Sequence, residues 1–160
     1  MESTILPPRN NRYEGSKVAL YYLVLLGCMF TFRGSVHYFA PDGGSGIIAG
    51  IPLETYPKGA VQAIINSFGV YGIGHLLEAV IVWLVVFRYR ALIPITLAFV
   101  LASQVLGVVL ITMKPLPVIP PGQIAVYVLV PISLAAFLLS IRTSTARAAR
   151  LVSQRGEPTC

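Results

Sequence analysis

The sequence predicts an all-α membrane protein: a single domain built as a polytopic four-helix bundle with both termini on the cytoplasmic side. Hydrophobic residues make up 56% of its 160 residues, and charged residues only 11%. Soluble domains carry about 25% charged residues, so this deficit favours a membrane protein. The chain also contains four long apolar runs, and a helix needs roughly 20 such residues to cross a bilayer. Short connections separate the runs, which leaves no room for a separate soluble domain.

The positions of the basic residues predict the orientation. The chain ends and the connection between the second and third runs hold most of them: Arg9, Arg12, Lys17, Arg88, Arg90, Arg142, Arg147, Arg150 and Arg155. The two other connections hold only Lys58 and Lys114. Cytoplasmic loops carry such an excess of lysine and arginine, so we expect a multi-pass protein of the cell membrane with both termini in the cytoplasm. Nucleic acid is not an expected partner, because no reader motif accompanies these arginines.

The first half of the chain is expected to form a tail, a helix and a loop. Residues 1–17 are polar and form a cytoplasmic tail, and residues 18–39 form the first spanning helix. Residues 40–59 begin with the turn sequence Pro-Asp-Gly-Gly and contain further glycines and prolines, which prevent a regular helix. The middle of this outer loop is apolar, so we expect it to fold back onto the outer mouth of the bundle.

The second half is expected to add three spanning helices and a basic tail. The third helix contains no charged residue, and the fourth contains Pro131, which predicts a kink. A proline-rich outer turn separates these two helices. The expected ranges are 60–87, 91–113 and 123–141 for the helices, and 142–160 for the cytoplasmic tail.

Ionisable residues interrupt the apolar runs. His75 and Glu78 lie three positions apart in the second predicted helix and so share one face, with Tyr71 one turn before His75. A carboxylate within a membrane helix is costly unless it faces a partner or a cavity. A rise of about 1.5 Å per residue, counted from the cytoplasmic end, puts Arg33 of the first helix at a similar height. The sequence therefore predicts a buried Arg33–His75–Glu78 cluster, whose members are the candidate catalytic residues.

The same count brings polar residues of the other helices to this layer. Gln104 of the third helix and Tyr127 of the fourth reach a similar height, while His37 lies about two turns further out, near Asn66. Asp42 belongs to the turn that opens the outer loop. The candidate ligand-binding residues are Tyr71, Gln104, Tyr127, His37, Asn66 and Asp42.

Two interpretations of the cluster stay open. In the structural one, its members only satisfy one another and set the register of the bundle. In the functional one, they line a small cavity in which a ligand or a proton meets a carboxylate–imidazole pair. Imidazole and carboxylate are the groups that enzymes most often use to transfer protons.

No metal or cofactor is expected. The pattern H-x-x-E occurs once, whereas bundles with two carboxylate-bridged metals use paired motifs and further glutamates. The two cysteines, Cys28 and Cys160, form no C-x-x-C motif, so disulfide exchange has no support.

Three stretches of the sequence carry a resemblance to known proteins. They are RGSVHYFAPDGGSGIIAGIPL, FRYRALIP and KPLPVIPPG, the last of them ahead of a final helix that ends LLS. In these stretches, and over about residues 26–140, the chain resembles small four-helix integral membrane proteins of unknown function, chiefly bacterial. Their architecture is similar to that of the DoxX-like bundles, which implies an accessory role in the membrane. The resemblance supplies no catalytic residues.

The expected function is an accessory role or the binding of a small lipophilic molecule in the membrane. An alternative is an acid–base isomerase or cyclase for a hydrophobic substrate, with Glu78 and His75 carrying protons and Arg33 holding an oxyanion. A further alternative is a proton-coupled transporter of small molecules. The lipid bilayer is an expected partner, and a homodimer or a complex with another membrane protein would be compatible with this architecture.

Overall fold

The computed structural model describes residues 8–115 and 118–155, with residues 142–155 as backbone only. Four α-helices make up this part of the chain: α1 (Lys17–Phe39), α2 (Lys58–Arg88), α3 (Ile93–Met113) and α4 (Pro121–Arg155). Short 3₁₀ helices at Leu53–Thr55 and Arg90–Leu92 belong to the connections, and no strand occurs among the described residues. The predicted all-α class is confirmed.

Each of the four helices contains a stretch long and apolar enough to cross a membrane, which suggests a multi-pass membrane protein. Their large apolar side chains are exposed over much of the surface, as lipid-facing side chains are. Phe32 on α1 and Leu106 on α3, for example, are 70% and 68% exposed. The surface of a soluble protein rarely presents such long continuous apolar faces.

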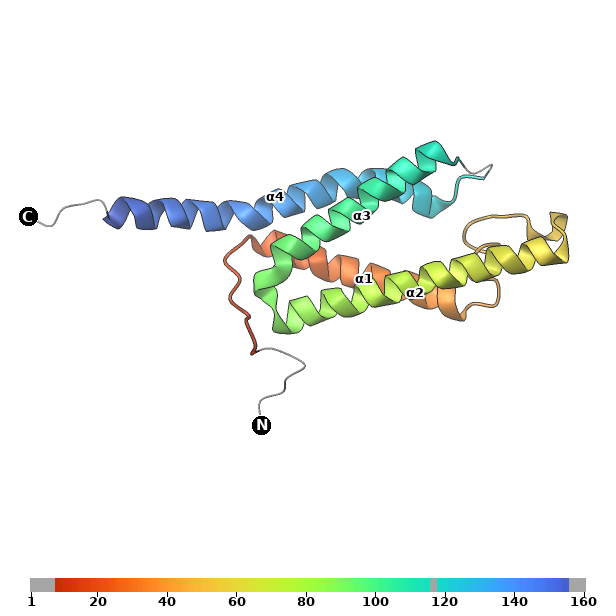
Figure 1. Ribbon diagram of the computed structural model, residues 1–160, viewed down its shortest axis with the longest axis horizontal. Coiled ribbons are helices and arrows are strands. Elements are labelled where there is room, and N and C mark those ends of the chain that lie inside the picture. The colour runs from red at the N-terminus through yellow and green to blue at the C-terminus, as the bar shows by residue number, and fades with distance from the viewer. Residues whose placement is uncertain (1–7, 116–117, 156–160) are drawn as a thin grey trace, which may run out of the picture.

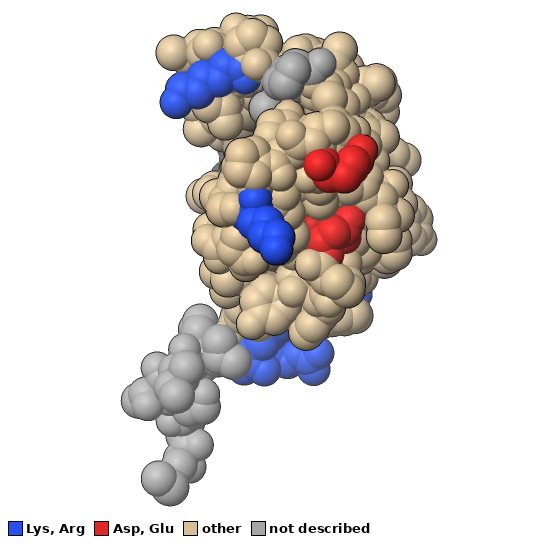
Figure 2. Space-filling view, turned by 90° about the vertical axis from the view of Figure 1, so that its right-hand side faces the viewer, with Lys and Arg blue, Asp and Glu red and all other residues tan. Residues whose placement is uncertain are grey.

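The helices form two antiparallel hairpins, α1 with α2 and α3 with α4 (Figure 1). The N-terminal segment and the α2–α3 turn lie at one end of the molecule, and the loop after α1 and the α3–α4 connection lie at the other (Figure 1). Figure 2 looks onto this second end, whose surface is mostly uncharged with a few acidic and basic side chains. The fully buried core joins the hairpins and includes Leu23, Leu26, Val82, Ile93, Leu97 and Val100.

The fourth helix is longer than its apolar run. The membrane-compatible stretch ends at Ile141, near the predicted helix end, but helical backbone continues to Arg155. We expected a tail from residue 142. The residues that follow include alanine, arginine, leucine and glutamine, which favour helix, and neither proline nor glycine interrupts them before Gly156. Figure 1 shows α4 reaching beyond the other helices at this end.

The N-terminal segment of residues 9–13, which we call the N-terminal strap, crosses the end of α2. The Asn10 backbone N–H donates to the Arg88 carbonyl at 3.2 Å. The side chains of Arg9 and Asn11 both donate to the Phe87 carbonyl at 3.3 Å. The last carbonyls of a helix have no partner within the helix, so the strap satisfies groups that would otherwise need water.

Two glycines allow α1 and α2 to touch at the height of the histidines. A Cβ atom on Gly72 would lie 2.8 Å from the Cβ of His37, and one on Gly34 would lie 2.9 Å from the backbone nitrogen of Leu76. Both distances are too short for a real side chain. The close crossing of the two helices therefore depends on these glycines, as in other membrane helix pairs.

Candidate functional site

The predicted contact between His75 and Glu78 is present. Nδ1 of His75 lies 2.9 Å from Oε2 of Glu78, one turn further along α2. With Glu78 ionised and His75 neutral, the carboxylate accepts, Nδ1 donates, and Nε2 is left as an acceptor. This Nε2 is buried and has no hydrogen-bond partner among the described residues. One ring nitrogen of His75 is therefore hydrogen-bonded to Glu78, while the other has no hydrogen-bond partner among the described residues.

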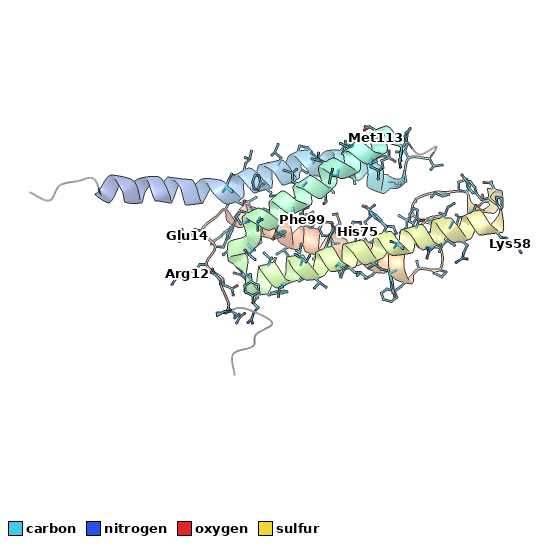
Figure 3. The ribbon with its side chains drawn as sticks, in the orientation of Figure 1. Arg12, Glu14, Lys58, His75, Phe99 and Met113 are labelled. Atoms are coloured by element: carbon cyan, nitrogen blue, oxygen red, sulfur yellow. The ribbon has the colours of Figure 1, made fainter. Side chains whose placement is uncertain are left out.

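Aromatic rings enclose the imidazole of His75. The Phe30 ring of α1 stacks on it with centroids 5.5 Å apart, and the Tyr71 ring meets it edge-on at 4.4 Å. His75 lies on the side of α2 that faces α1 (Figure 3). Tyr71 is 49% exposed and the Glu78 side chain 24%, so these two residues of the site reach the molecular surface.

His37 lies next to His75 rather than in a separate outer layer. Their rings are 6.5 Å apart and nearly parallel. Counting residues from each helix end predicted a separation of about two turns, but that count ignores the angle and position at which α1 and α2 cross. His37 Nδ1 donates to the Gly43 carbonyl at 2.7 Å, and its Nε2 accepts from Nε of Arg33 at 3.3 Å.

Arg33 contacts Tyr71 and His37 rather than the expected His75 and Glu78. Its guanidinium lies 5.4 Å from the Tyr71 ring centroid and, across the space between the hairpins, against Gly122 at the start of α4. Among the residues that the structure describes, it forms no hydrogen bond or ion pair with His75 or Glu78. Arg33, Tyr71, His37 and His75 are brought together, but not as the direct Arg33–His75–Glu78 network that the sequence predicted.

The remaining candidates are Gln104, Tyr127, Asn66 and Asp42, and none of them belongs to this group of four side chains. Gln104 is buried on α3, and its Oε1 has no partner within the described chain. Tyr127 is half-exposed on α4, and Asn66 is exposed on α2. None of these three forms a hydrogen bond or ion pair with His75 or Glu78 in the described part of the chain.

Asp42 organises the loop that covers His37. Its Oδ1 accepts from the backbone of Gly44 at 2.8 Å, and its Oδ2 from Ile47 at 2.9 Å and Gly46 at 3.0 Å. The hydrogen bond from Ile47, followed by those from Gly44 and Gly46, lowers the pKa of the Asp42 carboxyl. The adjacent Gly43, which has φ 61°, presents its carbonyl to His37. By holding the backbone of this loop, Asp42 helps to fix the Gly43 carbonyl that accepts the hydrogen bond from His37.

The empty space beside Glu78 is small. A crevice of about 10 Å³ between α2 and α3 is lined by Glu78, Ile81, Val82, Thr96, Phe99 and Val100. Figure 3 shows Phe99 on α3 and His75 on α2. This volume is near the minimum for one water molecule and far below that of a small-molecule pocket. The cluster is therefore neither fully paired nor set beside a large enclosed cavity.

The residues that sequence reasoning missed are Gly34, Gly72 and Phe30. The glycines bring the histidines together, and Phe30 supplies a stacking surface. The signal for the glycines is present, since Gly72 lies three residues before His75 and Gly34 lies three before His37. A glycine in a membrane helix commonly marks a close helix contact, but the sequence does not say which helix is the partner.

The described residues contain no group of three or more histidine, cysteine, aspartate and glutamate side chains that could hold a metal ion. Comparison of the chain with protein-family models, with curated proteins and with solved structures finds no match.

Proposed function

We propose that this protein binds a small lipophilic molecule with a hydroxyl group, and that the hydroxyl donates to Nε2 of His75. The observation that carries the proposal is the unsatisfied, buried Nε2. A buried acceptor without a partner costs about 1–3 kcal/mol, so such a group in a native fold calls for an explanation. A ligand hydroxyl within the membrane would remove this cost.

The ligand would enter from the side, because the space at Glu78 holds about 10 Å³. Tyr71 packs edge-on against His75 and is itself half-exposed. Rotation of its side chain away from His75 would uncover Nε2 toward the lipid. A lipophilic molecule partitions into the bilayer and reaches such an opening without passing through water.

Arg33 would hold a second polar atom of the ligand. Its guanidinium lies against the Tyr71 ring and carries five N–H donors, of which Nε is used for His37. A carbonyl or ether oxygen beside the hydroxyl would accept from the remaining donors. The preferred ligand class is therefore a lipophilic hydroxy compound with a neighbouring oxygen.

A second candidate function rests on the bond between His75 and Glu78. If His75 takes the proton of the bound hydroxyl, Glu78 stabilises the imidazolium that results. The same pair could then return a proton to another atom of the substrate, as an isomerase or cyclase requires. Arg33 would hold the oxyanion.

The proposal also includes the orientation of the protein, its role in the membrane and its architectural relation to other proteins. Both termini are cytoplasmic and the membrane is the cell membrane, since the basic residues gather at the chain ends and at the α2–α3 turn. The protein works as an accessory or binding component of that membrane. Its architecture is related to that of the DoxX-like bundles, a relation supported by the four apolar helices and the loop sequences.

The test compares two probes, 4-octylphenol and its methyl ether 4-octylanisole, for binding to the full chain in lipid nanodiscs. We expect the phenol to bind about fivefold more tightly, the ratio given by one hydrogen bond of about 1 kcal/mol. His75→Phe keeps an aromatic ring but removes the acceptor, so the ratio should fall to about one. Gln104→Leu, which removes another buried side-chain acceptor without a partner, should keep it. Equal binding of both probes to the wild type, or an unchanged ratio in His75→Phe, would overturn the proposal.

A further inference from the structure

A groove at the C-terminal end of α2 is independent of the histidine cluster. It has a volume of about 510 Å³, is open to the surroundings, and lies where the N-terminal strap crosses the end of the helix. The residues that line it are Arg9, Val80, Trp83, Leu84, Phe87 and Arg88. Four of these six are apolar and two are arginines, so the groove combines two kinds of surface.

The apolar part of the groove is one face of α2. Val80, Leu84 and Phe87 are spaced four and three residues apart, and together with Trp83 they form a stripe roughly 10 Å long along the helix axis. Val80 and Phe87 are 63% and 61% exposed. The Trp83 and Phe87 rings stack at 5.5 Å, and the indole N–H donates to Thr31 at 3.0 Å, which fixes the ring plane.

The cationic part lies at the helix end. Arg9 is held there by the strap, with its Nη2 3.3 Å from the Phe87 carbonyl. Arg88 is positioned beside Tyr89, to which its Nε donates at 3.0 Å. Two guanidinium groups from separate parts of the chain therefore stand at the same end of the apolar stripe. Guanidinium groups bind phosphate oxygens with paired, charge-assisted hydrogen bonds.

We infer that this groove is a binding site for an anionic phospholipid, whose phosphate contacts Arg9 and Arg88 and whose acyl chain lies along Val80, Trp83, Leu84 and Phe87. The groove has the orientation that a lipid has in a bilayer leaflet. Its charged end lies at the end of a spanning helix, and its apolar end lies nearer the middle of that helix. Tryptophan at the interface and basic residues beside anionic headgroups are both favourable there. The two arginines make the site selective for negative charge, which a purely apolar groove would not be.

The chain contains a single tryptophan, and it lies in this groove, so its fluorescence reports directly on the occupant. The experiment reconstitutes the full chain in mixed vesicles in which either phosphatidylglycerol or phosphatidylcholine carries brominated acyl chains, which quench tryptophan on contact. At equal mole fractions, we expect brominated phosphatidylglycerol to quench Trp83 as if enriched at least fivefold, since one arginine near the surface favours an anionic lipid by about that factor. Equal quenching by the two lipids overturns the inference.

Matched variants separate a built site from general surface charge. The double change Arg9→Gln with Arg88→Gln should reduce the enrichment to about onefold. Arg12→Gln removes one charge from the same strap outside the groove and should leave the enrichment unchanged (Figure 3). If Arg12→Gln lowers it as much as the double change, the groove is not the site.

A pair of lysine substitutions tests whether the effect of the glutamine pair comes from loss of folding. Arg9→Lys with Arg88→Lys alters the same hydrogen bonds to the protein as the glutamine pair but retains both charges. It should keep more than half of the enrichment. An enrichment as low as that of the glutamine pair would show that the effect comes from damage to the strap, and would overturn the inference.

Discussion

His75 and Asp42 illustrate two ways in which a single polar residue is used in this protein. His75 is buried in the bundle with one nitrogen paired and one unpaired, a costly arrangement that a ligand can relieve. Asp42 lies in the loop after α1 with both oxygens paired to backbone N–H groups. In the proposed function the first binds a ligand hydroxyl, while the second builds the loop whose Gly43 carbonyl accepts a hydrogen bond from His37.

Asp42 should make the loop sensitive to acid. Its pKa is lowered in the folded state by the backbone hydrogen bonds, first of all that of Ile47, relative to about 3.9 in an unfolded chain. The ionised carboxylate therefore stabilises the loop above about pH 4, and this stability is lost as the pH falls through the folded pKa. The amide resonances of Gly44 and Ile47, followed from pH 7 to 2, should titrate with a midpoint below 3.9.

A midpoint at or above that value would contradict this role of Asp42. Asp42→Asn supplies the control, because its side chain stays neutral. In this variant the acid-dependent change should disappear. The loop should be destabilised at neutral pH by about 1 kcal/mol, because the amide nitrogen of Asn cannot accept the hydrogen bonds made to one of the carboxylate oxygens.

At the scale of elements, the contact between α1 and α2 decides where the histidines lie. Gly34 and Gly72 leave no room for a Cβ atom at the crossing, so the two backbones pack directly. The crossing puts the His37 ring 6.5 Å from the His75 ring. A helix pair held further apart would break up the aromatic enclosure that keeps Nε2 of His75 out of water.

Gly72→Ala should therefore destabilise the protein by about 1–3 kcal/mol, the usual cost of forcing extra atoms into a packed site. Gly74→Ala is the matched control on the same helix, since a Cβ there would meet nothing within 4 Å. Alanine favours helix over glycine by about 1 kcal/mol, so this control should be neutral or stabilising. The loss of helical circular dichroism during titration with a denaturing detergent measures both. Equal effects of the two changes would contradict the close crossing.

The helices could be predicted from sequence far better than their packing. Length and apolar composition are local properties, and they predicted four helices, the first three of them close to the observed bounds. The bond from His75 to Glu78 is also local, since residues three apart share a helix face. The position of His37 beside His75 depends on which helix Gly34 and Gly72 contact and at what angle, and a single sequence carries no direct record of that. The helical extension beyond Ile141 was missed because polarity suggested a tail where the residues in fact favour helix.

At the scale of the whole molecule, the two proposed sites lie at different heights of α2. The histidine cluster is in the middle of the helix, where Tyr71 and Glu78 are partly exposed. The lipid groove is at its end, beneath the N-terminal strap. In the two proposals, α2 contributes the acceptor nitrogen of His75 to one site and Arg88 to the other, where Arg9 of the N-terminal strap supplies the second arginine. A lipophilic hydroxy compound and an anionic phospholipid would not compete for the same contacts.

The ¹⁵N NMR spectrum of the histidine rings shows directly whether Nε2 of His75 is an unprotonated acceptor that a ligand hydroxyl can reach. The chain has only two histidines, so selective ¹⁵N labelling of histidine gives four ring signals, and His37→Gln assigns them. We predict that Nδ1 of His75 carries the proton and that Nε2 does not. Adding 4-octylphenol should shift the Nε2 signal of His75, whereas 4-octylanisole should leave it in place. A protonated Nε2 in the free protein, or an Nε2 signal that neither probe moves, would contradict the account.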